Sequence, residues 1–131
     1  MNFESFTGQV QHRLELAEQG EAVRASRAIL TTLGESLSPE TARELAHHLP
    51  TEIDRFPVAG ETGQERSYRE FVTRIGEYEH EDAPDASYDA QVFVAYLAEV
   101  VPADVIQRVR DDLPPGFDKL FAVADRQGTT G

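Results

Sequence analysis

The histidines are the side chains of this sequence best suited to bind a metal ion or to relay a proton. His12 and Glu15 lie three residues apart, and Glu77 and His80 repeat that spacing 65 residues later in the reverse order. Glutamate and histidine side chains at this helical spacing form the metal sites of di-iron carboxylate bundles. Helical geometry, however, turns His12 about 160° away from the apolar stripe of its own helix, towards solvent. A metal- or small-ligand-binding protein that uses these four residues is therefore an alternative hypothesis.

Other patterns that would indicate catalysis are missing from the sequence. The chain has no cysteine, which excludes disulfides, thiolate nucleophiles and cysteine-based zinc sites. It has neither a nucleophile elbow nor a glycine-rich phosphate loop. Ser26 lies within an apolar stripe, so we expect its hydroxyl to donate to a backbone carbonyl one turn earlier. We expect a protein that is not an enzyme and that needs no cofactor.

One sequence element occurs twice in the chain. Residues 49–56 read Leu-Pro, two variable residues, apolar, Asp, basic, apolar, and residues 113–120 read the same way at an offset of 64. The same offset pairs apolar residues further upstream, namely Leu45 with Val109, Leu37 with Val101, Leu33 with Leu97 and Ile29 with Phe93. Self-similarity at one fixed offset indicates two copies of a structural unit, each too small to bury a good core alone.

Apolar residues recur at three- and four-residue steps, which is the period of an amphipathic α-helix. The pattern predicts an all-α protein of six main helices with one or two short ones. We expect a single domain, 1–131, made of two three-helix units at 2–57 and 67–125. The linker 58–66 joins them, and a pseudo-twofold axis is expected to relate them in one helical bundle.

Helix ends are predicted from capping residues. Starts are expected where a capping side chain precedes an apolar stripe, at Asn2, Ser38 and Ser67. Gly20 is expected to end the first helix. The acidic stretch 79–85 is expected to be a loop that ends with Asp85 as the cap of a helix over about 86–100.

The charge of the chain limits the classes of partner. Twenty-four acidic residues against 12 basic ones give a net charge of −12, and Lys119 is the single lysine. An acidic, lysine-poor surface is typical of a protein adapted to high salt, although a GC-rich genome also favours arginine over lysine. No basic cluster exists that could neutralise phosphates, so we expect no nucleic-acid partner. No apolar run approaches 18 residues, so we expect no membrane span and a cytoplasmic protein.

The helix expected at 86–100 has a second apolar row in addition to its core stripe. That row consists of Tyr88, Val92 and Tyr96. The matching row of the first copy consists of Arg24, Ala28 and Thr32. A helix that is apolar most of the way round is either central in its fold or covered by another chain. Both explanations remain open, and the row is the candidate surface for a protein partner or for self-association.

Taken in order, three features resemble the prokaryotic helical family catalogued as domain of unknown function 2267. They are Phe6-x-x-x-Val10, the helix 24–33, and the Leu49-Pro50-x-x-Ile53-Asp54-Arg55 element with its echo at Leu113. The resemblance covers residues 2–125 and implies an all-α domain without an established activity or catalytic residues. Together with the absence of a catalytic set, it favours a non-enzymatic interaction or regulatory module.

Overall fold

Every regular element in the described part of the chain is a helix. The computed structural model describes residues 1–128 and contains no strand within them, which confirms the all-α prediction. The α-helices are α1 (Phe3–Arg13), α2 (Gln19–Glu35), α3 (Pro39–His47), α4 (Tyr68–Glu79), α5 (Ala83–Val100), α6 (Ala103–Asp112) and α7 (Ala122–Gly128). Two 3₁₀ helices, η1 (Ile53–Val58) and η2 (Phe117–Phe121), follow α3 and α6.

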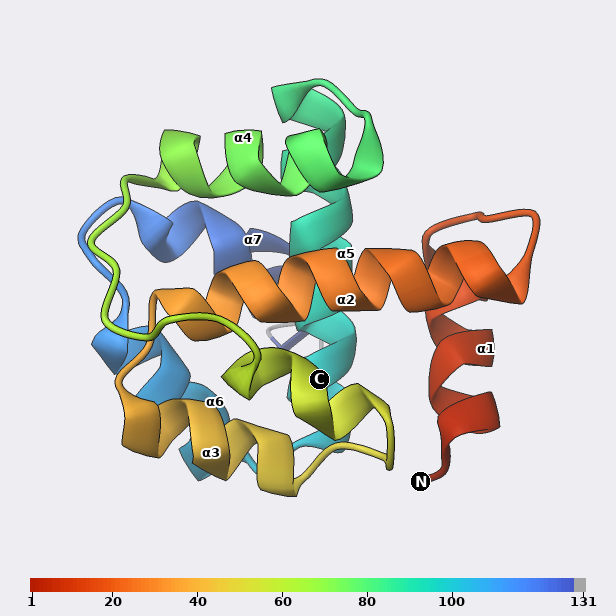
Figure 1. Ribbon diagram of the computed structural model, residues 1–131, viewed down its shortest axis with the longest axis horizontal. Coiled ribbons are helices and arrows are strands. Elements are labelled where there is room, and N and C mark those ends of the chain that lie inside the picture. The colour runs from red at the N-terminus through yellow and green to blue at the C-terminus, as the bar shows by residue number, and fades with distance from the viewer. Residues whose placement is uncertain (129–131) are drawn as a thin grey trace.

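Two long helices organise the fold. Figure 1 shows α5 crossing α2 near the middle of the molecule, with α4 on one side and the α3–α6 pair on the other. Helix α1 lies against the N-terminal half of α2. The order of three α-helices and a 3₁₀ helix occurs twice along the chain. The pseudo-twofold relation between the two sets remains a prediction.

One continuous hydrophobic core joins the two predicted units. It includes Phe6 of α1 against Phe93 of α5, with ring centroids 6.0 Å apart, and Phe71 of α4 against Phe117 of η2 at 5.2 Å. Each ring is 2% exposed or less. Because residues from both units bury one another, the stability of either unit depends on the other.

The predicted caps at the starts of three helices are confirmed. Asn2 accepts a hydrogen bond from the Ser5 amide, and Ser38 accepts one from the Thr41 amide. Ser67 begins α4 with a complete capping box, in which the Glu70 side chain also accepts from the Ser67 amide. Such caps satisfy amides that have no partner within the helix.

Two predicted boundaries are wrong. Gly20 lies in the first turn of α2, because α1 already ends at Arg13 and the chain turns at residues 14–18. Helix α5 begins at Ala83, several residues earlier than expected. The cap is Asp82, whose Oδ1 accepts from the Asp85 amide at 3.0 Å, and Pro84 fits the first turn, where its missing N–H costs nothing.

The end of α2 touches η1 more closely than any side chain would allow. A Cβ atom at Gly34 would overlap the carbonyl oxygen of Pro57. Glycine at this position lets the backbone of η1 lie directly against α2. As predicted, Ser26 in the middle of α2 donates to the Ala22 carbonyl at 2.8 Å.

Candidate binding surfaces

The three residues of the predicted partner row have three different environments. Tyr88 is 59% exposed, Val92 is half-buried against the core, and Tyr96 is only 5% exposed. Of the two explanations left open for this row, cover within the chain therefore holds for Tyr96, which does not belong to an exposed partner surface. Its ring lies 5.3 Å from that of Phe6 and under the Arg13 guanidinium at 4.7 Å, so α1 covers it.

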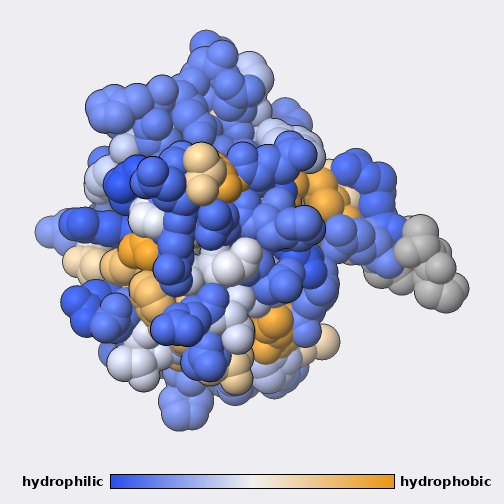
Figure 2. All heavy atoms as spheres, turned by 90° about the vertical axis from the view of Figure 1, so that its right-hand side faces the viewer, coloured by the Kyte–Doolittle hydropathy of each residue, from blue (hydrophilic) through white to orange (hydrophobic). Residues whose placement is uncertain are grey.

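Tyr88 and Val92 border a hollow between α1, α5 and α7, which we call the Tyr88 hollow. Its volume is about 820 Å³. Its apolar residues are Tyr88, Val92 and Val123, and the remaining wall is polar, formed by Gln9, His12, Arg13, Glu15, Glu99 and Gln127. The face on the α1 side of the molecule is mostly hydrophilic, with its hydrophobic residues in separate small patches (Figure 2).

An ion pair links α1 and α5 at this hollow. The Arg13 guanidinium donates two hydrogen bonds to the Glu99 carboxylate, one of them from Nη2 to Oε1 at 3.0 Å. These bonds lower the pKa of Glu99. The pair therefore stays charged at neutral pH, and a bidentate contact restricts the orientation of both side chains.

The four candidate metal ligands do not form a site. Residues 1–128 contain no group of three or more histidine or acidic side chains that could hold a metal ion. His12 and Glu15 are exposed beside the Tyr88 hollow, whereas His80 ends α4 in a left-handed conformation and Glu77 is exposed on α4. The His12, Glu15, Glu77 and His80 cluster is therefore not supported, because α1 and α4 present these residues to solvent.

A second concavity, which we call the linker groove, lies where the linker 58–66 passes the C-terminal end of α2. Its volume is about 710 Å³, and its walls are residues 36–38, 63–67, Asp112, Pro114 and Pro115. The linker is fixed to the end of α2 by two backbone bonds, from the Gly63 amide to the Leu37 carbonyl and from the Gln64 amide to the Glu35 carbonyl. The groove is thus built from both halves of the sequence.

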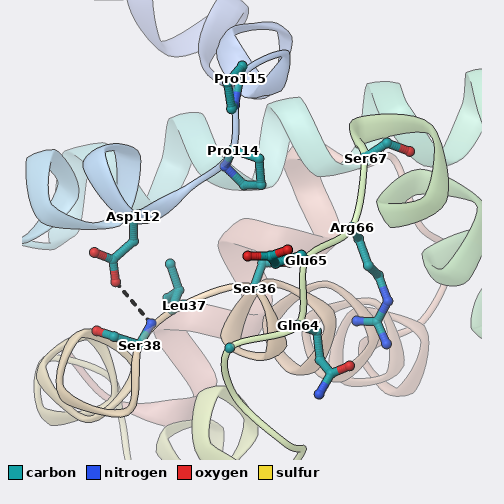
Figure 3. Close-up of a pocket in the computed structure, with 11 residues that line it drawn as sticks. Ser36, Leu37, Ser38, Gln64, Glu65, Arg66, Ser67, Asp112, Pro114 and Pro115 are labelled. Atoms are coloured by element: carbon teal, nitrogen blue, oxygen red, sulfur yellow. Dashed lines mark hydrogen bonds between the residues drawn. The ribbon is translucent and has the colours of Figure 1, made fainter.

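The polar side chains around the linker groove point in different directions. In Figure 3 the Glu65 side chain extends from the linker towards Asp112, whereas Gln64 and Arg66 point away. Asp112 accepts a hydrogen bond from the Ser38 amide at 3.0 Å. Burial alone would raise the pKa of Asp112, but bonds from Ser38 and Thr41 outweigh burial, and the pKa is lowered. Asp112 is therefore ionised at neutral pH.

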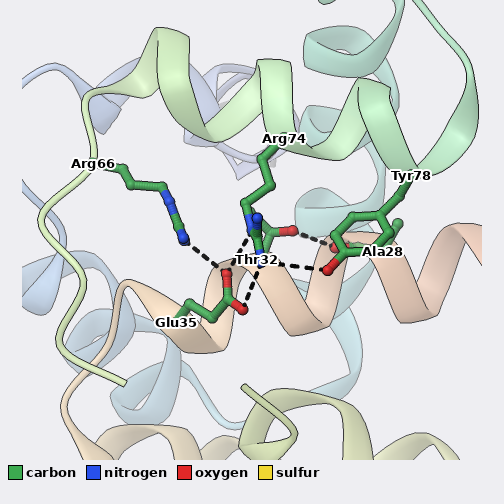
Figure 4. Close-up of polar contacts among 6 residues, drawn as sticks. All are labelled: Ala28, Thr32, Glu35, Arg66, Arg74 and Tyr78. Carbon is green, nitrogen blue, oxygen red and sulfur yellow. Dashed lines mark hydrogen bonds and ion pairs between the residues drawn. The ribbon is translucent and has the colours of Figure 1, made fainter. Parts of the chain in front are cut away.

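Behind the groove, a buried carboxylate holds the linker in place. Glu35 accepts hydrogen bonds from Arg66 Nη1 at 2.7 Å and from Arg74 Nε at 2.9 Å, and its side chain is 7% exposed (Figure 4). The Arg74 guanidinium also lies over the Tyr78 ring. Two arginines supply the donors that a buried carboxylate requires, so the end of α2, the linker and α4 are joined.

The turn between α4 and α5 brings acidic residues together. Burial, and then hydrogen bonding and repulsion from Glu81, raise the pKa of Asp89 to about 7. One carboxylate oxygen of Glu81 is buried without a hydrogen-bond partner among the described residues. A proton on Asp89 would supply the donor that this oxygen lacks.

A family model described as "Uncharacterized conserved protein (DUF2267)" matches residues 3–120. The chain belongs to the DUF2267 family. A comparison with curated proteins found no match. Membership of DUF2267 confirms the resemblance seen in the sequence and brings no assigned site residues with it. Among the helices of residues 1–128, none combines the length and the apolarity that crossing a bilayer requires.

Two features of this DUF2267 protein were missed by the sequence-based interpretation. The first is the contact of Glu35 with Arg66 and Arg74, although Glu35 and Glu99 occupy matching positions at the offset of 64. The matching positions of Glu35 and Glu99 are the signal in the sequence that could have indicated an ion pair at Glu35. The second is the linker groove, which depends on the path of residues 63–67, and no periodicity predicts that path.

Proposed function

We propose that this DUF2267 protein is a non-enzymatic interaction module that binds a protein partner in the Tyr88 hollow. The observation that carries the proposal is the tyrosine that is 59% exposed beside half-buried Val92, in a concavity of about 820 Å³. Tyrosine is enriched among the residues that contribute most to protein–protein binding. An apolar centre with a polar margin is the usual anatomy of an interface.

The charge of the protein favours a basic partner over a second copy of the chain. A net charge of −12 makes two copies repel each other unless salt screens them. Glu15 at the margin of the hollow has no ion-pair partner among the described residues. A basic side chain flanking the partner's apolar anchor would complement it.

The experiment compares two exposed tyrosines. Tyr88→Glu alters the hollow, and Tyr78→Glu makes the same change on α4, outside it. The partner of the wild-type chain is first identified by mass spectrometry and purified. We expect the Tyr78 variant to bind this partner as the wild-type chain does, and the Tyr88 variant to bind it at least tenfold more weakly. Equal affinities for the two variants would contradict the proposal. Light scattering on the same samples tests the self-association alternative.

We further propose that the acidic surface adapts the protein to high salt. Screening of like charges at molar salt supports this view, because it removes the self-repulsion expected of a net charge of −12. The melting temperature should rise between dilute buffer and 2 M KCl. A melting temperature that stays constant over this range would contradict the adaptation. A cytoplasmic location and the absence of a nucleic-acid partner fit the same surface and remain proposals.

The duplication is also proposed rather than observed. Two ion pairs support it, since Glu35 of α2 binds Arg74 of α4, whereas Glu99 of α5 binds Arg13 of α1. Each glutamate thus pairs with the first helix of the other unit. An experimental structure in which residues 22–56 superpose on 86–120 within a few ångströms would establish the relation. Unrelated positions of Leu33 and Leu97 would reject it.

A further inference from the structure

We propose that the linker groove binds a small organic cation, an ammonium or guanidinium group on an aliphatic stem. The site is separate from the Tyr88 hollow and shares no residue with it. Its volume of about 710 Å³ lies within the range of small-molecule sites. The proposal rests on the groove itself, on a buried hydroxyl without a partner, and on the charges that face the groove.

Ser36 supplies the observation that points to a ligand. It lines the groove, it is only 6% exposed, and its Oγ has no hydrogen-bond partner among the described residues. A buried hydroxyl without a partner is uncommon, because the lost hydrogen bonds with water are not replaced. A ligand with an N–H donor would satisfy this oxygen.

The charges around the groove select a cation. Arg66 donates to Glu35, a carboxylate that it shares with Arg74, and its side chain points away from the groove in Figure 3. Asp112 is ionised, as its lowered pKa indicates, and it is held by the Ser38 amide. Glu65 makes no hydrogen bond or ion pair with any described residue. The charge left without a counterion is therefore negative.

The remaining wall suits an aliphatic stem. Pro114 and Pro115 also line the groove, and their rings contribute carbon atoms without amide donors. The backbone bonds of Gly63 and Gln64 to the end of α2, together with the Glu35–Arg66 pair, hold the linker wall in position. A site fixed in this way loses little conformational freedom when a ligand binds.

The test uses 1,4-diaminobutane as the cation and 1,4-butanediol as a neutral molecule of the same length. Binding is followed by NMR titration of the backbone amides at constant ionic strength. Because any cation is attracted to a chain of charge −12, the decisive comparison is between two variants that remove one charge each from the linker. Glu65→Gln changes the groove, whereas Glu61→Gln changes an exposed residue outside its lining.

We expect saturable binding of the diamine, no binding of the diol, and shifts centred on residues 36–38 and 63–67. Glu65→Gln should weaken the affinity about tenfold, and Glu61→Gln should leave it within twofold. Ser36→Ala should also weaken binding without lowering the melting temperature, because it removes an unsatisfied hydroxyl. Equal affinities of the two glutamine variants, or equal binding of diol and diamine, would overturn the proposal.

Discussion

Helices α2 and α5 occupy equivalent places in the order of elements, but the matching faces of the two helices are buried to different extents by the helices that pack on them. On α2, Ala28 and Thr32 are buried, with α4 lying across them (Figure 4). On α5, the residues at the matching positions are Val92, which is half-buried, and Tyr96, which is buried. Helix α1 covers only the Tyr96 end of this row. Small residues allow α4 to lie close to α2, whereas Tyr88 and Val92 border a hollow that α1 does not fill.

The difference shows that an apolar row in the sequence and an exposed row in the fold are separate properties. The more polar row, Arg24, Ala28 and Thr32, has the better-covered side chains at its last two positions. Thr32 can be buried because its hydroxyl donates to the Ala28 carbonyl at 2.7 Å. Cover depends on which helix packs against the row from elsewhere in the chain. The candidate partner surface is the part of α5 around Tyr88, which is 59% exposed among the described residues.

The largest expected effect comes from the matching glutamates. Glu35→Ala leaves Arg66 and Arg74 without their buried carboxylate, so it should lower the free energy of unfolding by about 3 to 5 kcal/mol. Glu99→Ala removes a carboxylate whose side chain is 47% exposed, and it should cost at most about 1 kcal/mol. Urea denaturation of both variants measures the contrast. Similar losses in the two variants would mean that the two ion pairs are equivalent.

Gly34 and Ala98 test the close packing of α2. Gly34→Ala places a methyl group on the Pro57 carbonyl and should cost about 3 kcal/mol, despite the better helix propensity of alanine. Ala98→Gly, at the matching position of α5, should cost about 1 kcal/mol through helix propensity alone. Thermal melts of the two variants provide the measurement. A Gly34→Ala variant as stable as the wild type would show that η1 does not lie against α2 as described.

The acidic turn gives α5 a pH response that α2 lacks, since Ala25 occupies the position that matches Asp89. The pKa of Asp89 is about 7 in the folded chain and about 3.9 when unfolded. Between these values the folded state binds more protons, so stability falls as pH rises from about 4 to 7. Asp89→Asn should therefore raise stability at pH 8 by about 1 kcal/mol, after allowance for partial exposure, and have little effect at pH 4.

Several charged groups face Asp89, and a pH series of melts distinguishes their contributions. Glu79 and Glu81 flank it, and Arg24 and Glu21 of α2 lie near Glu79. The pKa values of Glu99, Asp112 and Asp125 are lowered by hydrogen bonds, so the stability they contribute is lost only below about pH 4. A wild-type melting temperature that rises from pH 5 to pH 7 would contradict the assignment to Asp89.

The smallest expected effect is on Tyr88. Tyr88→Arg copies the residue that α2 has at the matching position, and the side chain is exposed. The free energy of unfolding should change by no more than about 0.5 kcal/mol. Chemical denaturation checks this value. A loss above about 2 kcal/mol would mean that Tyr88 packs within the domain and is not available to a partner.

The sequence predicted the features that depend on local patterns. Helical periodicity, the caps at Asn2, Ser38 and Ser67 and the bond of Ser26 to Ala22 are all present, since each is set by residues within one turn of each other. The start of α5 was misplaced because Asp82 and Asp85 are both suitable caps, and only the structure shows which one accepts the amide bond.

The candidate sites depend on long-range packing and were predicted only in part. The sequence left open whether the row Tyr88, Val92 and Tyr96 is exposed or covered. In the structure Tyr88 is exposed and Tyr96 is buried, because α1 lies over that end of α5. Likewise, the spacing of His12 with Glu15 and of Glu77 with His80 says nothing about whether α1 and α4 turn these faces together. Periodicity defines a face of a helix and does not define its neighbour.

Site-specific photocrosslinking from positions 88 and 78 in living cells tests the central claim most directly. A benzophenone amino acid replaces Tyr88 in one variant and Tyr78 in the other, and both side chains are exposed. The account predicts a discrete protein adduct from position 88 and none from position 78, because only the first lies in the hollow between α1, α5 and α7. No adduct from position 88, or the same adduct from both positions, would contradict it.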